Sequence, residues 1–108
     1  MSVNTSQNKY DSIDNLIFNE GLKINSVDFS NSLDTMYVQL TNDLMFVIPV
    51  QLFDSLKKSN RKSLYNFKLV ADDTGIHWPE LDEDLSLKGF LKDYLKQKIH
   101  SEKELVFS

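Results

Sequence analysis

The clearest structural signal in this chain is the run MYVQLTNDLMFVI, residues 36–48. On both sides of the polar triplet TND, apolar side chains recur at every second position, which is the pattern of a β-strand. The triplet itself has the composition of a tight turn. The run therefore predicts a β-hairpin. Pro49 ends its second strand, because proline cannot donate a hydrogen bond to a neighbouring strand.

Further strands are predicted on both sides of the hairpin. Residues 22–29 and 67–71 are rich in β-branched and aromatic side chains, and residues 76–78 are extended because Pro79 disfavours the helical conformation in the residue before it. Gly75, at the end of an acidic turn, permits a positive φ. The expected sheet is small and antiparallel, with three to four strands.

Two helices complete the predicted α+β domain. A short helix is expected at about 50–58, where apolar residues recur at helical spacing after the proline. A C-terminal helix at about 87–99 has an apolar stripe on one face and lysines on another, and Ser86 is its expected N-cap. Glu83 and Asp84 precede this helix, where carboxylates interact favourably with its positive end. Both helices are expected to pack against the sheet.

The length and composition of the chain predict a single domain. A chain of 108 residues closes one apolar core, and a hydrophobic content of 41% is enough to fill it. The domain is expected to span residues 21–99. A polar arm at 1–20 precedes it and is partly docked through the apolar triplet LIF at 16–18, and a tail at 100–108 follows it.

Several classes of protein are excluded or disfavoured by what the sequence lacks. The chain has no cysteine, so disulfides, thiolate metal sites and cysteine nucleophiles are excluded. The first twenty residues lack the features of a signal peptide, and the longest apolar run, at 44–50, is too short to cross a bilayer. Nucleophile elbows and phosphate-binding glycine loops are absent. We therefore expect a cytoplasmic protein with no catalytic residues, no cofactor and no membrane contact.

The segment GIHWPELDEDLS, residues 75–86, is the most distinctive part of the sequence. It resembles the signature of the bacterial domain-of-unknown-function 2442 family, in which a strand leads through a Trp-Pro-x-Leu-Asp-x-Asp turn into the last helix. The run LMFVIP at 44–49 looks like the second hairpin strand of that family. The resemblance covers about residues 22–95. It implies a compact α+β domain without established catalytic activity, whose gene is often paired with that of another small protein in an arrangement that looks like toxin and antitoxin.

Three functions are compatible with the polar residues of the chain. The leading hypothesis is a non-catalytic protein-interaction module, the antitoxin-like or regulatory partner of a small bacterial protein encoded by an adjacent gene, with contacts from Trp78, Glu80, Asp82, Asp84, Lys88 and Lys92. The second is a nucleic-acid-binding regulatory protein that uses Lys57, Lys58, Arg61, Lys62 and Lys96. The third is a metal-dependent enzyme built on His77 and the adjacent acids, because zinc and manganese accept imidazole and carboxylate ligands.

Each of these features also has a purely structural interpretation. The acids can accept backbone N–H bonds and stiffen the turn, and Trp78 can pin the turn to the core by burying about 200 Å². Lysines opposite an apolar stripe are most often a solvated face. The net charge of −4 argues mildly against nucleic acid as the partner. An exposed edge of so small a sheet would also permit a homodimer.

Overall fold

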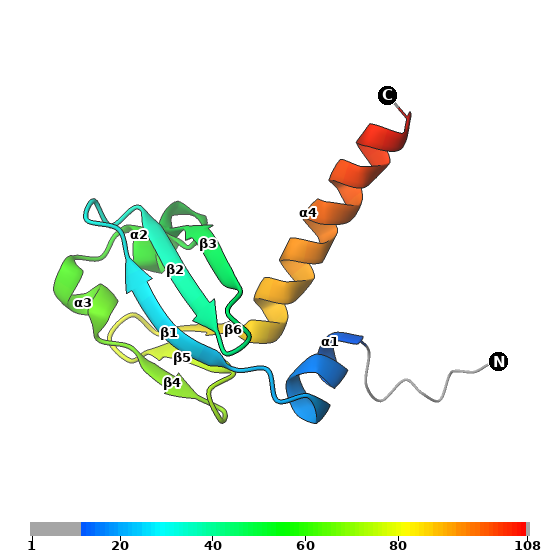
Figure 1. Ribbon diagram of the computed structural model, residues 1–108. Helices are drawn as coiled ribbons and strands as arrows, with labels where there is room; N and C mark the ends of the chain where they lie inside the picture. Colours follow the sequence, from blue (N-terminus) through cyan, green and yellow to red (C-terminus); the bar gives the residue numbers. More distant parts are fainter. Residues whose placement is uncertain (1–11, 108) are drawn as a thin grey trace.

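The computed structural model describes the backbone of residues 12–107 and the side chains of residues 12–97, so residues 1–11 of the predicted arm lie outside the described range. Within this range, six strands form two three-stranded antiparallel sheets. Figure 1 shows the two sheets against each other and the C-terminal helix projecting from them. The predicted α+β class is confirmed, with two small sheets in place of one.

The first sheet contains the predicted hairpin and has the strand order β1-β2-β3. Its strands are β1 (Ile24–Phe29), β2 (Thr35–Leu40) and β3 (Met45–Pro49). Met36 pairs with Ile48 and Val38 with Phe46, so the apolar residues of the two strands share the inner face. In the turn, Asp43 adopts a φ of 71°. The hairpin at 36–48 and the end of its second strand at Pro49 are both confirmed.

The second sheet contains a strand that the sequence analysis did not predict. Its order is β4-β5-β6, with β4 (Lys68–Val70), β5 (Gly75–Trp78) and β6 (Glu83–Ser86). Trp78 pairs with Glu83 across a short turn in which Asp82 has a φ of 51°. Glu83 and Asp84 therefore lie in a strand that leads directly into the C-terminal helix, and their carboxylates contact Ser55 and His77. Acidic residues are uncommon in strands, so β6 has little local signal.

The loop between β4 and β5 corrects the expectation for Gly75. The positive φ angles fall on Ala71, Asp72 and Asp73, at 53°, 57° and 64°. Gly75 instead lies buried in β5, where an added Cβ would come within 3.1 Å of the Val70 side chain. The close approach of the two strands, and not the turn, is therefore what favours glycine at this position.

The predicted helix at 50–58 is divided into two short pieces. A 3-10 turn, η4 (Val50–Leu52), follows Pro49, and α2 (Asp54–Lys57) begins after Phe53. Phe53 is extended, with φ −121° and ψ 109°, and packs against the core. Tertiary packing of this side chain has overridden the local helical spacing. A further helix, α3 (Arg61–Tyr65), is capped by Asn60, whose side chain accepts a bond from the Ser63 N–H at 2.9 Å.

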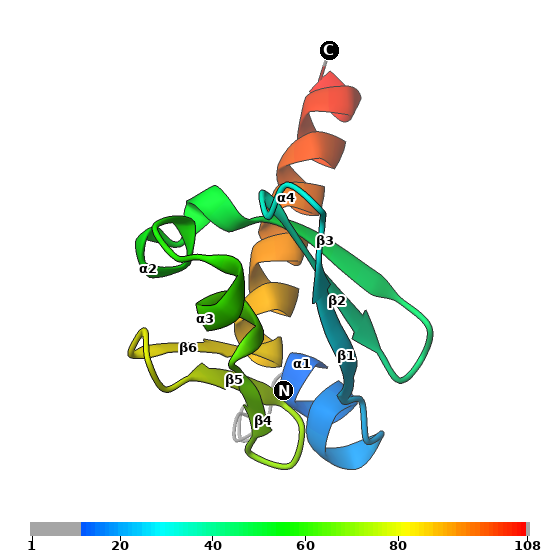
Figure 2. The ribbon, with the colours of Figure 1, turned by 90° about the vertical axis from the view of Figure 1, so that its left-hand side faces the viewer.

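The C-terminal helix, α4 (Leu87–Phe107), begins where the sequence predicts but extends beyond residue 99. Its first turns pack into the domain, with Leu87, Phe90 and Leu91 buried. Beyond them Tyr94 is 49% exposed, so the apolar stripe continues past the part of the helix that the sheets cover. Figures 1 and 2 show α4 rising away from both sheets. No helix in the described part of the chain is both long and apolar enough to span a membrane.

The N-terminal segment packs beside the start of α4. It consists of α1 (Ser12–Asp14) and a π-helical turn, η3 (Asn15–Asn19). Ile13 and Ile17 are buried, whereas Phe18 is 62% exposed. The Asp14 carboxylate and the Lys88 ammonium form an ion pair, 2.7 Å apart. The apolar triplet at 16–18 thus contributes mainly Ile17 to the core.

Replacing Ser86 with alanine is expected to destabilise the protein by about 1 kcal/mol, because α4 loses its N-cap. The Ser86 hydroxyl accepts a hydrogen bond from the Gly89 N–H at 3.0 Å, which confirms the predicted cap. Chemical denaturation followed by circular dichroism measures the change. Ser86→Asp keeps an acceptor at this position and should retain most of the stability; an alanine variant as stable as the wild type would contradict the assignment.

Candidate protein interface

The acidic turn is mostly exposed, but its tryptophan is not. Trp78 has no exposed surface and donates a hydrogen bond from its ring N–H to the Leu64 carbonyl at 2.9 Å. It also packs against Phe67, with ring centroids 6.1 Å apart. Glu80 and Asp82 are exposed. The structure therefore places Trp78 in the core beneath the turn, where its ring makes no contact with solvent, and leaves the carboxylates at the surface.

His77 and the neighbouring acids do not converge on one point. His77 and Asp84 are paired across β5 and β6, and their nearest ring nitrogen and carboxylate oxygen are 2.7 Å apart. Glu83 points elsewhere and accepts a hydrogen bond from the Ser55 hydroxyl in α2. Among the side chains that the structure describes, no three His, Cys, Asp or Glu residues gather closely enough to hold a metal ion. Successive side chains of a strand point to opposite faces of the sheet, so the neighbouring residues Glu83 and Asp84 point apart.

The basic residues fall into separate groups. The basic cluster of residues 57–62 lies on and between α2 and α3, and its four cationic side chains are exposed. Arg61 also donates to the Asn31 carbonyl at 2.9 Å, which ties α3 to the turn after β1. Lys88 contacts Asp14, whereas Lys92 and Lys96 are exposed on α4. In Figure 1, α3 and α4 lie on opposite sides of the domain, so the basic cluster of residues 57–62 and the lysines of α4 do not form one surface.

The carboxylates with altered pKa values serve the fold and lie outside the acidic turn. The pKa of Asp28 is lowered, first by a hydrogen bond from the Tyr65 hydroxyl at 2.6 Å and then by the Phe29 N–H. The same bond raises the pKa of Tyr65. The pKa of Asp34 is lowered by the hydroxyls of Ser32, Ser30 and Thr35. Hydrogen bonding to the charged form accounts for these shifts without a catalytic role.

The stability of the protein is expected to fall as the pH drops below about 4, the ordinary range of an aspartate pKa. Asp28 and Asp34 have lowered pKa values in the folded state, so they stabilise the fold above their unfolded pKa, and this contribution is lost as the pH falls through their folded pKa. Thermal unfolding of Asp34→Asn and the wild type should differ at neutral pH and converge in acid. A difference that persisted unchanged in acid would contradict the assignment.

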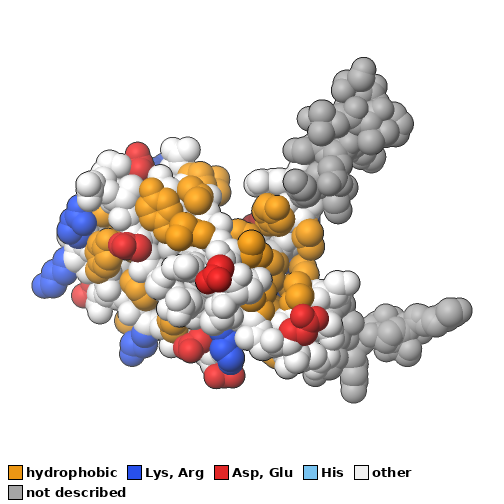
Figure 3. All heavy atoms as spheres, viewed as in Figure 1, with side chains coloured by type: hydrophobic (Ala, Val, Ile, Leu, Met, Phe, Trp, Pro, Cys, Tyr) orange, Lys and Arg blue, Asp and Glu red, His pale blue; other side chains and the backbone are white. Residues whose placement is uncertain are grey.

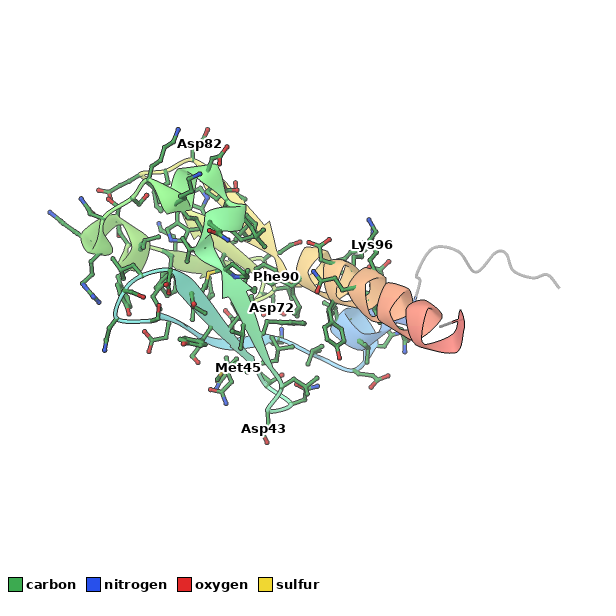
Figure 4. The ribbon with its side chains drawn as sticks, turned by 90° about the horizontal axis from the view of Figure 1, so that it is seen from above. Asp43, Met45, Asp72, Asp82, Phe90 and Lys96 are labelled. Atoms are coloured by element: carbon green, nitrogen blue, oxygen red, sulfur yellow. The ribbon has the colours of Figure 1, made fainter. Side chains whose placement is uncertain are left out.

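A large apolar recess lies between β3 and α4, and of the site residues predicted from the sequence only Lys96 lines it. We call it the β3–α4 groove. It has a volume of about 700 Å³ and is lined by Met45, Phe46, Val47, Ile48, Pro49, Leu52, Phe53, Phe90, Asp93, Tyr94, Lys96 and Gln97. Figure 3 shows hydrophobic side chains gathered where the first sheet meets the start of α4. Figure 4 places Met45, Phe90 and Lys96 on this side and Asp82 at the other end of the domain.

Aromatic rings on the two walls of the groove contact each other, and several large apolar side chains that line the groove are exposed to solvent. The ring of Phe46 on β3 lies 6.1 Å from that of Phe90 and 6.0 Å from that of Tyr94, both on α4. Val47 is 63% exposed and Leu52 is 64% exposed. A contiguous apolar surface of this kind is unusual on a monomer and typical of a binding surface.

One wall of the groove is a strand edge with open main-chain groups. In the described part of the chain, β3 pairs with β2 alone. The Leu40 N–H bonds to the Leu44 carbonyl at 2.8 Å, which sets the phase of the β2–β3 ladder. Residues that bond to a given neighbour alternate along an antiparallel strand, so the N–H and C=O groups of Met45 and Val47 point away from β2. The edge can therefore accept a further strand.

The sequence contains a signal for this surface in the apolar residues of β3. In the run 44–48, Leu44, Phe46 and Ile48 lie on one face of the strand, and Met45 and Val47 lie on the other. A strand that is apolar on both faces is usually buried on both. In this structure only one face of β3 is covered by the domain. The apolar pattern therefore indicates that the other face is available to a binding partner.

Two solved structures resemble the chain, and neither has a known function. A crystal structure of a protein of unknown function from Rhodospirillum rubrum ATCC 11170 is 26% identical with a TM-score of 0.58, over 67% of this chain and 87% of that one. The solution NMR structure of an uncharacterized protein from Chromobacterium violaceum is 20% identical with a TM-score of 0.61, over 85% of each chain, and shows a similar fold alone. No curated protein matches the chain.

The comparison with protein families agrees with the signature at 75–86. Residues 24–94 match the family described as "Protein of unknown function (DUF2442)". The matched region runs from β1 into α4 and contains most of the β3–α4 groove, while α1 and η3 precede it. This chain therefore belongs to the DUF2442 family of proteins of unknown function.

Proposed function

We propose that this protein is a non-catalytic interaction module that holds a segment of another polypeptide chain in the β3–α4 groove. The observation that carries the proposal is the apolar groove beside a strand edge with outward-facing main-chain groups. Binding there would remove exposed apolar surface from water and satisfy the open N–H and C=O groups of β3. The groove offers no charged cluster that could activate a substrate.

The partner that the family resemblance implies is a small bacterial protein encoded by an adjacent gene. In that arrangement this chain is the antitoxin-like or regulatory member of the pair. The exposed carboxylates of the turn between β5 and β6, and separately Lys92 on α4, are available for additional contacts. Exposed charges of this kind affect the rate and specificity of association more than its strength, so the groove is the main site.

Co-expression with the product of the neighbouring gene tests the proposal. A stable complex should co-purify with the wild type, and Leu52→Glu should weaken it at least about tenfold, because a carboxylate would enter the apolar groove. Leu44→Glu is the matched control. Leu44 is 58% exposed and Leu52 64%, but only Leu52 lines the groove.

Two results would count against the proposal. One is the absence of a complex with any neighbouring gene product. The other is an equal loss of binding in Leu44→Glu and Leu52→Glu, since an equal loss would mean that the groove has no special part in the contact. Circular dichroism on both variants confirms that the fold is intact.

A further inference from the structure

The β3–α4 groove sets chemical requirements on the segment that fills it. Its charged lining residues are Asp93 and Lys96, which are opposite in sign, so the groove has no net charge. The outward main-chain groups of Met45 and Val47 call for an extended segment that can continue the sheet. One face of that segment would contact Phe46 and Tyr94. Its other face would lie beside the exposed side chains of Met45 and Val47. Both faces of the segment therefore have to be apolar.

The β3 strand of the protein itself meets all of these requirements. Residues 44–53, LMFVIPVQLF, contain no charged side chain, so no like charges would oppose each other if two such strands were paired. The strand is extended and apolar on both faces. By contrast, residues 1–11, MSVNTSQNKYD, are mostly polar and lack a run of apolar residues. They do not have the composition that the groove requires.

We infer that, when the protein is alone in solution, a second copy of the chain occupies the groove through antiparallel pairing of the two β3 edges about Val47. This inference rests on the proposed function, because it names one occupant of the same binding surface. A symmetric antiparallel pair can be centred on a residue whose main-chain groups face the partner strand, and Val47 is such a residue. The β1-β2-β3 sheets of the two copies would then form one six-stranded sheet.

The pairing about Val47 fixes the neighbours of the other residues in β3. Phe46 comes to lie opposite Ile48 of the second copy, on the face that already contacts Phe90 and Tyr94. Met45 comes to lie opposite Pro49 of the second copy. Because Pro49 has no N–H, the ladder of hydrogen bonds ends there. The interface is isologous, so it does not continue into a fibre.

Analytical ultracentrifugation of the full chain tests whether the pair forms. The wild type should sediment as a dimer, with twice the chain mass of 12.5 kDa, and dissociate on dilution. Val47→Glu should raise the dissociation constant at least about tenfold, because it places two like charges opposite each other at the centre of the interface. Gln39→Glu is the control, since Gln39 lies on β2, away from the free edge. A wild type that remained monomeric at all concentrations would overturn the inference.

A charge-swap mixture tests the register. Val47→Glu and Val47→Lys should each be monomeric alone and should form a heterodimer when mixed, because only pairing about Val47 sets these two side chains opposite each other. Failure of the mixture to associate, with both variants folded by circular dichroism, would overturn pairing about Val47. The wild type could prove monomeric while the neighbouring gene product still bound in a manner sensitive to Leu52→Glu. In that case the proposed function would stand, and only the inference that a second copy occupies the groove would be wrong.

Discussion

Trp78→Ala is expected to lower the free energy of unfolding by about 4 kcal/mol, the largest effect of any single change considered. The indole has no exposed surface, so its removal leaves a large cavity between the second sheet and α3. The Leu64 carbonyl would also lose the hydrogen bond that it accepts from the ring N–H at 2.9 Å. Domains of this size have a total stability of about 5–15 kcal/mol, so the loss would leave little margin.

Urea denaturation followed by far-ultraviolet circular dichroism measures this effect. Trp78→Phe should lose less stability than the alanine variant, because it keeps most of the apolar volume and gives up the hydrogen bond. Leu52→Ala is the surface control, since Leu52 is 64% exposed and should cost well under 1 kcal/mol. Equal midpoints for Trp78→Ala and Leu52→Ala would show that Trp78 is not a structural anchor.

Lys88→Ala is expected to release the N-terminal segment at a cost of about 2 kcal/mol, because it removes the cation that contacts Asp14. The two groups are 2.7 Å apart, and the Asp14 side chain is only 11% exposed. The cost should be less than that of breaking a fully buried pair, because 39% of the Lys88 side chain is in contact with solvent. The effect should be local, since the sheets do not depend on this contact.

Amide hydrogen exchange distinguishes local release from global unfolding. The Glu20 N–H bonds to the Asn15 carbonyl at 3.1 Å, and the Leu22 N–H bonds to the Leu16 carbonyl at 3.0 Å. Both amides should exchange roughly thirtyfold faster in Lys88→Ala, while the Val50 amide in the sheet region should be unaffected. Lys92→Ala, one turn further along α4, is the control. Equal protection of Glu20 and Leu22 in the two variants would contradict a role for the ion pair in holding the segment.

The parts of the fold that the sequence predicted are those with strong local patterns. The hairpin follows from alternation and a polar turn within thirteen residues, and the start of α4 follows from a serine cap before an apolar stripe. The strand β6 was missed because Glu83 and Asp84 have a low intrinsic preference for strands. Its formation depends on pairing with β5 and on the packing of Leu85 against the core, which are interactions that no short window of sequence contains.

The candidate interface could be predicted only in part for the same reason. The apolar character of both faces of β3 was visible in the sequence, but its position at an edge depends on strand order. The partial exposure of Tyr94 depends on how far α4 extends past the sheets. The polar residues of the acidic turn and of α4 are of types that carry chemistry in many proteins. Here Trp78, Glu83 and Lys88 are engaged by other parts of the same domain.

The open edge of β3 also has a consequence for the production of the protein. An uncharged, apolar edge strand is a template for aggregation while a chain is newly synthesised or partly unfolded. Asp43 and Pro49 flank this strand as gatekeepers, because a charge at one end and a missing N–H at the other interrupt the growth of a fibril. The residues between them, Met45 to Ile48, contain neither a charged side chain nor a proline that would oppose the addition of another strand. The yield of soluble protein should therefore rise when the natural occupant of the groove is expressed in the same cell.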